Sequence, residues 1–323
     1  MLPPENERES ECLIMAIPES QLSNWTKLKT AATDSAQKTH QRIRSELEDS
    51  ESRLNNRGEM GFDTLLQGSY RNDTIVRGSG DVDILVFMTN PFSGSTNALP
   101  RRKKRQYQSD VPTWDEDYGL RDFQRDVYDE LVNIYGSGPV SQGSKAVAVD
   151  SDRSPLPADA DVVPCQTRRR YHSYNGDYQD ESNYYDGIRF YSSDGTKIIN
   201  FPKRHRKRGE ALNSKADGNY KETIRIFKNA RNRLVQKGRL QKEDAPSYYI
   251  ECLLSNVPSQ KFRTDDLQTR YVRIVEHLQD ADMRGFSAQH GLEDLFGRAE
   301  TKWRRRNAQT FISELVWLWQ NGG

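Results

Sequence analysis

The sequence contains few of the residues that build disulfide frameworks or zinc sites. Its three cysteines, Cys12, Cys165 and Cys252, lie far apart in 323 residues, and no two of them form a CxxC pair. Its five histidines form no HExxH motif or other clustered pattern of metal ligands. These absences exclude a disulfide-stabilised secreted module and argue against a structural zinc site.

Long hydrophobic runs are also missing. Hydrophobic residues make up 34% of the chain, and no apolar run approaches the ~20 residues that a membrane span requires. The first residues are polar apart from one short apolar patch (LIMA, 13–16), which is unlike a signal peptide. We therefore expect a soluble, cytoplasmic protein that does not interact with membranes.

An excess of charge of either sign is missing too. The chain has 48 Lys and Arg residues against 47 Asp and Glu residues, so its net charge gives no bulk attraction to nucleic acid. Basic residues do cluster at 101–105 (RRKKR), 202–208 (PKRHRKR) and 301–306 (TKWRRR). Few aromatic residues are interleaved with these runs, which favours solvated faces over a nucleic-acid groove. We do not expect nucleic acid to activate the protein, and we take a monomer as its default state.

The aromatic content, by contrast, suffices for a large core, because the chain has 15 Tyr, 11 Phe and 5 Trp. Periodicity predicts a long amphipathic helix over 18–53, then short strands and one more helix up to residue 201. A cationic loop is predicted at 202–211, and the pattern from about 218 to the end is helical. These features predict an α+β fold in which 1–201 form a catalytic lobe and 202–323 a helical lobe.

The most informative stretch is Leu65–Met88, which reads LLQGSYRNDTIVRGSGDVDILVFM. Residues i and i+2 of a strand share a face, so Asp81 and Asp83 are expected to point the same way. Two like charges side by side cost a few tenths to ~1 kcal/mol in a sheet. A divalent cation would turn this repulsion into a binding site. The alternative is that Asp81 is a solvated residue at a strand edge.

A third carboxylate follows on a separate predicted strand, within ADADVVPC (158–165). Asp161 directly precedes the apolar residues, and Asp159 shares its face and is the alternative ligand. Three carboxylates from two strands suit a two-metal site. The Gly68–Ser69 turn would supply backbone N–H groups and a hydroxyl for phosphate oxygens. This ordered set predicts metal-dependent nucleotidyl transfer.

The motifs QGSYRNDT, DVDILVFM and DVVP resemble those of the nucleotidyltransferase superfamily that includes DNA polymerase β. The later segments IINFPKRHRKRGEALNSKADGNYKETIRIFKNARNRL and APSYYIECLLSNVP are similar to the bacterial cGAS/DncV-like nucleotidyltransferases of CBASS anti-phage defence, most of all to clade E (CdnE). The resemblance covers Leu65 to Pro258. It implies a polymerase β-like fold with a mixed catalytic sheet, a long N-terminal helix and a C-terminal helical bundle, and an active site in the cleft between the lobes.

The resemblance also implies roles for the matching residues of the first lobe. Gly68 and Ser69 would hold the donor triphosphate. Asp81 and Asp83 would bind both of two Mg²⁺ ions, for which Mn²⁺ could substitute. Asp161 would be the third metal ligand and would help to activate the acceptor hydroxyl.

In the helical half, the resemblance assigns Lys228, Ser247 and Tyr248 to gripping the donor triphosphate and stacking on its base. Arg225 lies on the same helix stripe as Lys228, and this stripe could equally be a solvated helix face. Ser247 could equally be only the first residue of a helix. Gln166, just beyond the third acidic residue, could read a nucleobase edge with its amide, although packing at the edge of the core is the commoner role.

The resemblance implies a cyclic oligonucleotide synthase that joins nucleoside triphosphates such as ATP and UTP. The product would be a cyclic dinucleotide, with cyclic UMP-AMP or cyclic di-UMP among the candidates, that switches on a separate effector protein in bacterial anti-phage defence. Two alternatives remain open. The chain could transfer a nucleotide to an external acceptor, either an RNA 3′ end or a small molecule, or it could be an inactive binding scaffold.

Overall fold

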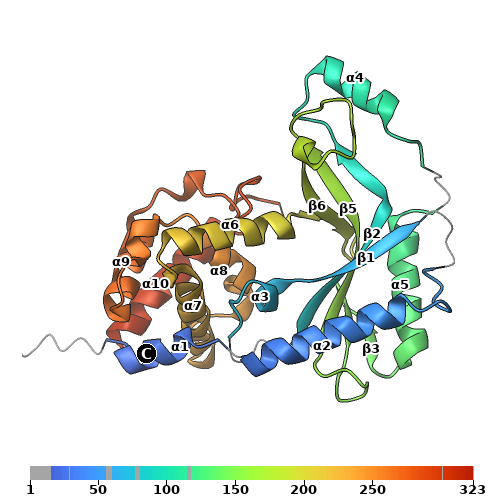
Figure 1. Cartoon of the computed structure of the whole chain (residues 1–323). Helices are drawn as coiled ribbons and strands as arrows, with labels where there is room; N and C mark the ends of the chain where they lie inside the picture. Colours follow the sequence, from blue (N-terminus) through green and yellow to red (C-terminus); the bar gives the residue numbers. More distant parts are fainter. Residues whose placement is uncertain are drawn as a thin grey trace, which may run out of the picture. The chain divides into compact units, whose positions relative to one another are not determined.

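The computed structural model describes two units, built from residues 16–28, 30–55, 60–76, 81–114, 118–299 and 301–322 (Figure 1). The sheet unit lies within 29–72 and 78–206, and the helical unit lies within 1–28, 73–77 and 207–323. The predicted boundary between 201 and 202 is close to the last of these divisions. The first helix and residues 73–76, however, group with the helical unit, whereas the sequence pattern places them in the catalytic lobe.

One mixed sheet forms the centre of the sheet unit. Its strands among the described residues are β1 (Gly61–Leu66), β2 (Val82–Ser95), β3 (Val140–Gln142), β4 (Val147–Val149), β5 (Ala160–Tyr171), β6 (Tyr184–Tyr191) and β7 (Lys197–Asn200). The strand order is β1-β2-β5-β4-β3, and β6 pairs with both β5 and β7. β2 and β5 run parallel, and the other pairs run antiparallel. The predicted mixed sheet is therefore confirmed.

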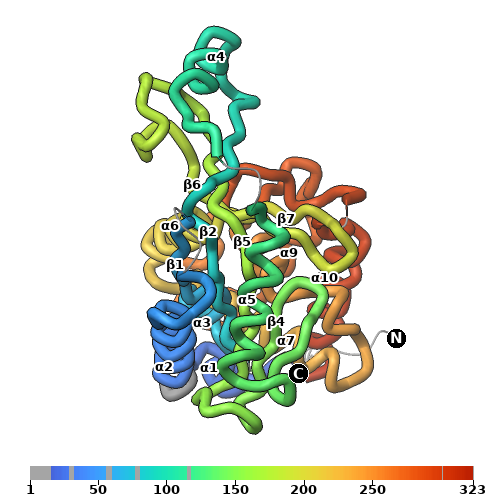
Figure 2. Tube along the Cα trace, turned by 90° about the vertical axis from the view of Figure 1, so that its right-hand side faces the viewer, coloured from blue at the N-terminus to red at the C-terminus, as the bar shows by residue number. Residues whose placement is uncertain are grey.

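Two helices pack against this sheet, α2 (Thr30–Leu47) and α5 (Leu120–Tyr135) (Figure 2). Alternate side chains of β2, namely Val82, Ile84 and Val86, are fully buried, as expected for strand residues that face a covering layer. The other face of β2 carries Asp83 and then Leu85, which belongs to a second apolar cluster. Alternation thus leaves Asp83 on the face opposite the fully buried valine and isoleucine side chains.

One end of the sheet carries a small aromatic core of its own. Here α4 (Arg101–Asp110) lies beyond the ends of β2, β5 and β6 in both views (Figures 1 and 2). The buried cluster consists of Phe92, Leu99, Tyr107, Tyr171, Tyr174 and Tyr184. The region 168–186 completes β5 and begins β6, and only its middle part forms a loop.

The predicted helix over 18–53 is wrong in one respect, because it consists of two helices. α1 (Glu19–Thr26) ends at Lys27, whose backbone is extended with ψ 126°, and α2 begins at Thr30. α1 buries Leu22 in the core of the helical unit, and α2 buries Ile43 in the sheet unit. The interruption therefore lets two segments with one continuous hydrophobic period bury their apolar stripes in different cores.

The helical unit contains α1 and most of the chain after residue 206. Its further elements are α7 (Asn219–Gln236), α8 (Ser247–Leu254), α9 (Leu267–Asp280) and α10 (Arg305–Gln320), with short 3-10 turns at Lys242–Asp244, Ser259–Phe262 and Met283–Gly285. In the sheet unit, a further 3-10 turn, Glu181–Asn183, precedes β6. No helix in the described part of the chain is both long and apolar enough to span a membrane.

The predicted cationic loop at 202–211 is also wrong, because these residues form the helix α6 (Pro202–Lys215). Proline suits the first position of a helix, where its missing N–H is not needed. Lysine and arginine have favourable helix propensities. The basic run at 101–105 is likewise helical, since it forms the first half of α4.

Candidate active site

The acidic residues of the sheet unit are brought together by the parallel pairing of β2 and β5. Asp83 and Asp161 are direct neighbours in the register, so their side chains share a face of the sheet. Asp81 lies two residues before Asp83, and the backbone N–H of Val82 donates a 2.8 Å hydrogen bond to the carbonyl of Asp159. Two residues far apart in the sequence, Asp83 and Asp161, therefore lie side by side at the start of two adjacent strands.

The Gly68–Ser69 turn lies directly against Asp83. Gly68 has φ +72°, and a Cβ atom at this position would lie 1.9 Å from Oδ2 of Asp83. The backbone N–H of Gln67 also donates a 2.8 Å hydrogen bond to the carbonyl of Asp83. Only glycine satisfies both the left-handed backbone and this close approach. The turn continues into the single-turn helix α3 (Gly68–Arg71).

Electrostatics also indicates that the acidic groups are close. Burial and then the charges of Asp81 and Asp159 raise the pKa of Asp161. Burial and then the charges of Asp81 and Asp83 raise the pKa of Tyr70, which is buried in α3. These shifts have the sign expected when negative charge accumulates in a partly buried place.

Asp159, the alternative third ligand, has partners of its own. The backbone N–H and the hydroxyl of Ser151 donate hydrogen bonds of 2.8 and 2.6 Å to its Oδ1. These bonds lower the pKa of Asp159, and its side chain is exposed. The structure therefore favours Asp161 over Asp159 as the third acidic residue of the site.

The carboxylate oxygens of Asp83 and Asp161 are suitable ligands for a divalent metal ion, although among the described residues they are not part of a preformed cluster of ligands. Within the described ranges, no group of three or more His, Cys, Asp or Glu side chains surrounds a common metal position. Mg²⁺ requires only one or two carboxylates when substrate phosphates and water complete its shell. Asp83 and Asp161 supply adjacent oxygen donors. A cation would offset the charges of Asp81 and Asp159, which raise the pKa of Asp161 together with the larger effect of burial. The residues fit a divalent ion shared with a nucleotide, and the full three-carboxylate site stays a prediction.

Lys228, in the helical unit, has internal partners. Its side chain is 1% exposed, and its Nζ lies 2.6 Å from Oε1 of Glu251. The same ammonium donates hydrogen bonds of 3.2 and 3.1 Å to the carbonyl and the hydroxyl of Thr74. The triphosphate contact stays a prediction, and it would require Lys228 to exchange these partners.

Arg225 is buried on the same helix and also binds the backbone. Its Nε donates to the carbonyl of Thr26, and its Nη1 donates to the carbonyl of Asp73. Burial lowers the pKa of this guanidinium. The open alternative of a solvated helix face is therefore wrong for both Arg225 and Lys228, which are 8% and 1% exposed.

Ser247 and Tyr248 open α8, directly after Pro246 at its N-cap. The Ser247 hydroxyl accepts a 3.2 Å hydrogen bond from Arg231. The Tyr248 ring packs edge-on against Tyr249 at 5.5 Å, and burial raises the pKa of Tyr248. Their roles in holding the triphosphate and the base stay predictions.

Gln166 occupies an internal position in β5. Its Nε2 donates a 2.8 Å hydrogen bond to the carbonyl of Pro91, and its Oε1 accepts a 2.6 Å hydrogen bond from Arg189. Both ends of the amide are thus engaged in a side chain that is 4% exposed. This environment favours packing, the alternative to base reading, so we leave Gln166 out of the proposed site.

Sequence reasoning missed two polar residues that join these groups, Thr74 and Glu251. Thr74 lies inside the QGSYRNDT motif, and Glu251 follows Ser247 by one helical turn. Their closeness to the predicted site residues in the sequence could have marked both as candidates. The hydrogen bond between them (Thr74 Oγ1 to Glu251 Oε1, 2.7 Å) joins residues 177 positions apart and is visible only in the structure.

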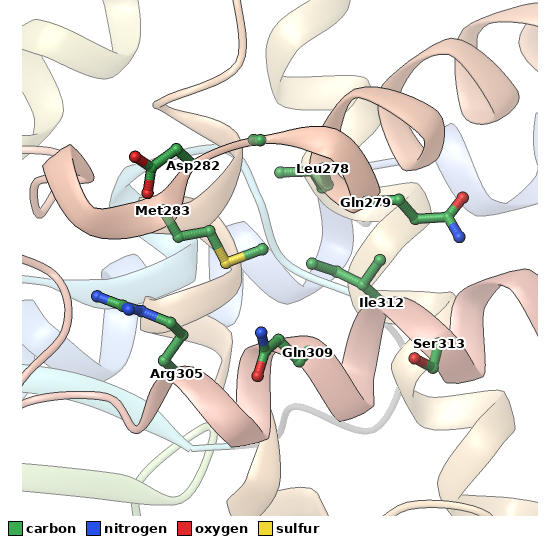
Figure 3. Close-up of a pocket in the computed structure, with 9 residues that line it drawn as sticks. Leu278, Gln279, Asp282, Met283, Arg305, Gln309, Ile312 and Ser313 are labelled. Atoms are coloured by element: carbon green, nitrogen blue, oxygen red, sulfur yellow. The ribbon is translucent and has the colours of Figure 1, made fainter.

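The helical unit also contains an open pocket of about 440 Å³ between the end of α9 and α10 (Figure 3). Leu278, Met283 and Ile312 supply its apolar side chains, and Arg305 and Gln309 supply polar ones (Figure 3). None of the predicted site residues lines it. We assign no function to this pocket.

Comparison with known proteins identifies the family. A family profile, the cGAS/DncV-like nucleotidyltransferase C-terminal helical domain, matches residues 207–320. The cyclic UMP-AMP synthase of Rhodothermus marinus (strain SG0.5JP17-172) is 36% identical over 311 residues, which cover 96% of this chain and 100% of that protein. The chain belongs to the CdnE group of cGAS/DncV-like nucleotidyltransferases. The family resemblance predicted from the motifs is thereby confirmed.

Other relatives of this CdnE-group chain agree. The cyclic nucleotide synthase CdnE01 of Staphylococcus haemolyticus is 34% identical and covers 94% of this chain and 99% of its own. The solved structure of the Rhodothermus marinus CdnE c-UMP-AMP synthase with Apcpp and Upnpp matches with a TM-score of 0.79 and 35% identity, over 95% of this chain and 98% of that one. The predicted polymerase β-like fold with a C-terminal helical domain is thus confirmed.

Proposed function

We propose that this chain joins two nucleoside triphosphates into a cyclic dinucleotide that contains at least one pyrimidine, with cyclic UMP-AMP as the first product to seek. The observation that carries the proposal is the contact of the Gly68–Ser69 turn with Asp83, beside Asp161 on the neighbouring strand. The match to a cyclic UMP-AMP synthase over that protein's whole length supports the choice of bases.

In each of the two proposed steps, a ribose hydroxyl oxygen attacks the α-phosphorus of a triphosphate. The new O–P bond replaces the bond to pyrophosphate, which leaves, and the hydroxyl proton is removed. Backbone N–H groups of the Gly68–Ser69 turn and the Ser69 hydroxyl would bind phosphate oxygens. Asp161, the neighbour of Asp83 on the adjacent strand, would accept the hydroxyl proton. Two Mg²⁺ ions held by Asp81, Asp83 and Asp161 would supply charge neutralisation when bound.

We further propose that the product acts as a diffusible signal for a separate effector protein in anti-phage defence. This part of the proposal follows from membership of the CdnE group. In this proposal the enzyme binds neither membranes nor an activating nucleic acid.

The test is product analysis by mass spectrometry after incubation with all four nucleoside triphosphates and Mg²⁺, followed by phosphatase. We expect a phosphatase-resistant cyclic dinucleotide containing uridine, formed without any added acceptor. Label that appears only on added RNA or on an added small molecule would instead support transfer to an external acceptor. Complete absence of nucleotide consumption would support the inactive scaffold.

A further inference from the structure

Residues 73–76 form an inserted segment that belongs to the helical unit, although the residues on either side of 73–77 belong to the sheet unit. Thr74, Ile75 and Val76 are 1, 1 and 3% exposed. Asp73 adopts a left-handed backbone with φ 58°, which is unusual for a residue other than glycine. The side chains of Thr74, Ile75 and Val76 are therefore buried, in a segment that groups with the helical unit.

One face of α7 holds this segment through three cations spaced i, i+4 and i+7. Lys221 pairs with the carboxylate of Asp73 at 2.7 Å. Arg225 donates to the carbonyl of Asp73, and Lys228 donates to both the carbonyl and the hydroxyl of Thr74. Residues with this spacing lie on the same side of a helix. The stripe predicted to face a nucleotide thus binds the chain itself.

The most deeply buried of these contacts join three side chains, which we call the anchor: Thr74, Lys228 and Glu251. Oε1 of Glu251 accepts from the Thr74 hydroxyl at 2.7 Å and from Lys228 at 2.6 Å. Lys228 has three N–H donors, and the two oxygens of Thr74 and the Glu251 carboxylate are acceptors for them. A buried charge is tolerated when it is paired and hydrogen-bonded in this way.

The inserted segment is tied through the chain to two parts of the candidate site. Ser69 precedes Thr74 by five residues, and Asp81 follows Val76 by five. Because a chain spans at most ~3.3–3.6 Å per residue, fixing 73–76 restricts where both groups can move.

We propose that the anchor positions the Gly68–Ser69 turn and Asp81 for nucleotidyl transfer, and that Lys228 acts through Glu251 and Thr74 rather than by contacting the triphosphate. This inference rests on the proposed function. It makes Lys228, Glu251 and Thr74 positioning residues, which are expected to alter the turnover number more than the apparent affinity for nucleotide.

The test compares Lys228→Met, Glu251→Gln and the double variant that combines them. Each single variant removes one charge of the buried Lys228–Glu251 pair, whereas the double variant removes both charges at similar volume. We expect kcat to fall at least ~10-fold in each single variant, since small displacements of reacting groups can cost ~100-fold in rate. We expect the double variant to recover to within about fivefold of wild type with nearly unchanged KM for each nucleotide.

A triphosphate contact predicts a different pattern. In that case every variant with Met at 228 raises KM for nucleotide about tenfold or more, and Glu251→Gln does not reverse the loss in the double variant. This result would overturn the proposal. Arg239→Met combined with Glu314→Gln is the matched control, because it removes an ion pair of 2.7 Å elsewhere in the helical unit.

Thr74→Val keeps the test valid if the charged single variants do not fold, because it removes only a hydroxyl. We expect lower kcat, unchanged KM and faster amide hydrogen exchange at residues 69–76. Unchanged kcat together with unchanged exchange would contradict the anchor. If the wild-type protein makes no cyclic product, the proposed function fails, and the exchange measurement alone then decides: faster exchange at 69–72 supports the anchor, and unchanged exchange overturns it.

Discussion

Gly68 is the residue whose identity the structure constrains most strongly in the candidate site. Its φ of +72° disfavours any side chain, and a Cβ would overlap the carboxylate of Asp83 at 1.9 Å. We expect Gly68→Ala to lower the rate of nucleotide consumption about 100-fold, because the turn or the carboxylate must move. The measurement is initial rate with ATP and UTP.

Gly195→Ala provides the matched control for backbone strain alone. Gly195 has φ +85°, and a Cβ there would meet nothing within 4 Å. It lies in the turn between β6 and β7. We expect nearly wild-type rates from this variant. Equal losses in both variants would show that strain, rather than the contact with Asp83, determines the effect.

Asp161 should destabilise the metal-free protein at neutral pH. Its pKa is raised above the ordinary value of 3.8, so ionisation disfavours folding as pH rises through that raised pKa, and the penalty is absent below about pH 3.8. We expect Asp161→Asn to raise the free energy of unfolding at pH 7 by up to about 1 kcal/mol while removing activity. Thermal unfolding in chelator from pH 3.5 to 8 measures this.

Asp159 should show the opposite sign. Its pKa is lowered by the hydrogen bonds from Ser151, so it contributes stability above pH 3.8 that is lost as pH falls through the lowered pKa. Asp159→Asn should therefore lower Tm at pH 7 and retain activity. A shift of both variants in the same direction would contradict the assignment of Asp161 as the acidic residue of the site.

At the level of single residues, the sequence pattern is sufficient to identify the Gly-Ser turn and the paired carboxylates as candidate active-site residues. Alternation could not separate Asp159 from Asp161, because both share one face. The distinction depends on Ser151, a residue of the preceding turn. The burial and ion pairing of Lys228 also could not be predicted from the sequence, because its partner Glu251 lies on a different helix.

Among the elements, α1 is held to the helical unit by a cap that it provides to α9. The two carboxylate oxygens of Glu19 accept hydrogen bonds of 2.9 and 3.0 Å from the backbone N–H groups of Leu267 and Gln268. The first N–H groups of a helix have no partner within the helix. We expect Glu19→Ala to cost about 1 kcal/mol, or roughly 2–4 °C in Tm, with unchanged activity.

The control for this cap is Glu48→Ala in the sheet unit. Glu48 pairs with Arg44 at 2.8 Å, and both side chains are more than 40% exposed, so this pair should contribute little. A loss of Tm for Glu48→Ala as large as that for Glu19→Ala would contradict a specific role for the cap.

Elements with strong local signals could be predicted. The hairpin of β6 and β7 has such signals, because apolar runs flank a Ser-Asp-Gly turn in which Gly195 takes the left-handed backbone. The break at Lys27 could not be predicted, because the hydrophobic period continues across it. Residues 202–211 form a helix rather than the predicted loop, because clustered charge does not by itself indicate a loop and Lys and Arg favour helices.

On the scale of the whole molecule, the division into two units is not a simple cut of the chain. Among the described residues, 16–28 and 73–76 group with the helical unit, and the others up to 206 group with the sheet unit. A four-residue apolar and polar segment such as Asp73–Val76 carries no periodicity that could assign it to either core. Its placement depends on partners on α7 and α8, which lie 152 to 177 residues later in the chain.

The central claim is that the carboxylates beside the Gly68–Ser69 turn carry out nucleotidyl transfer. The most direct measurement is pyrophosphate release together with phosphatase-resistant label from ATP and UTP, in wild type and in Asp81→Ala combined with Asp83→Ala. We predict release of two pyrophosphates per cyclic product in wild type with Mg²⁺, none with chelator, and none in the variant, whose circular dichroism and Tm should show a folded protein. Undiminished product from the folded variant would contradict the account.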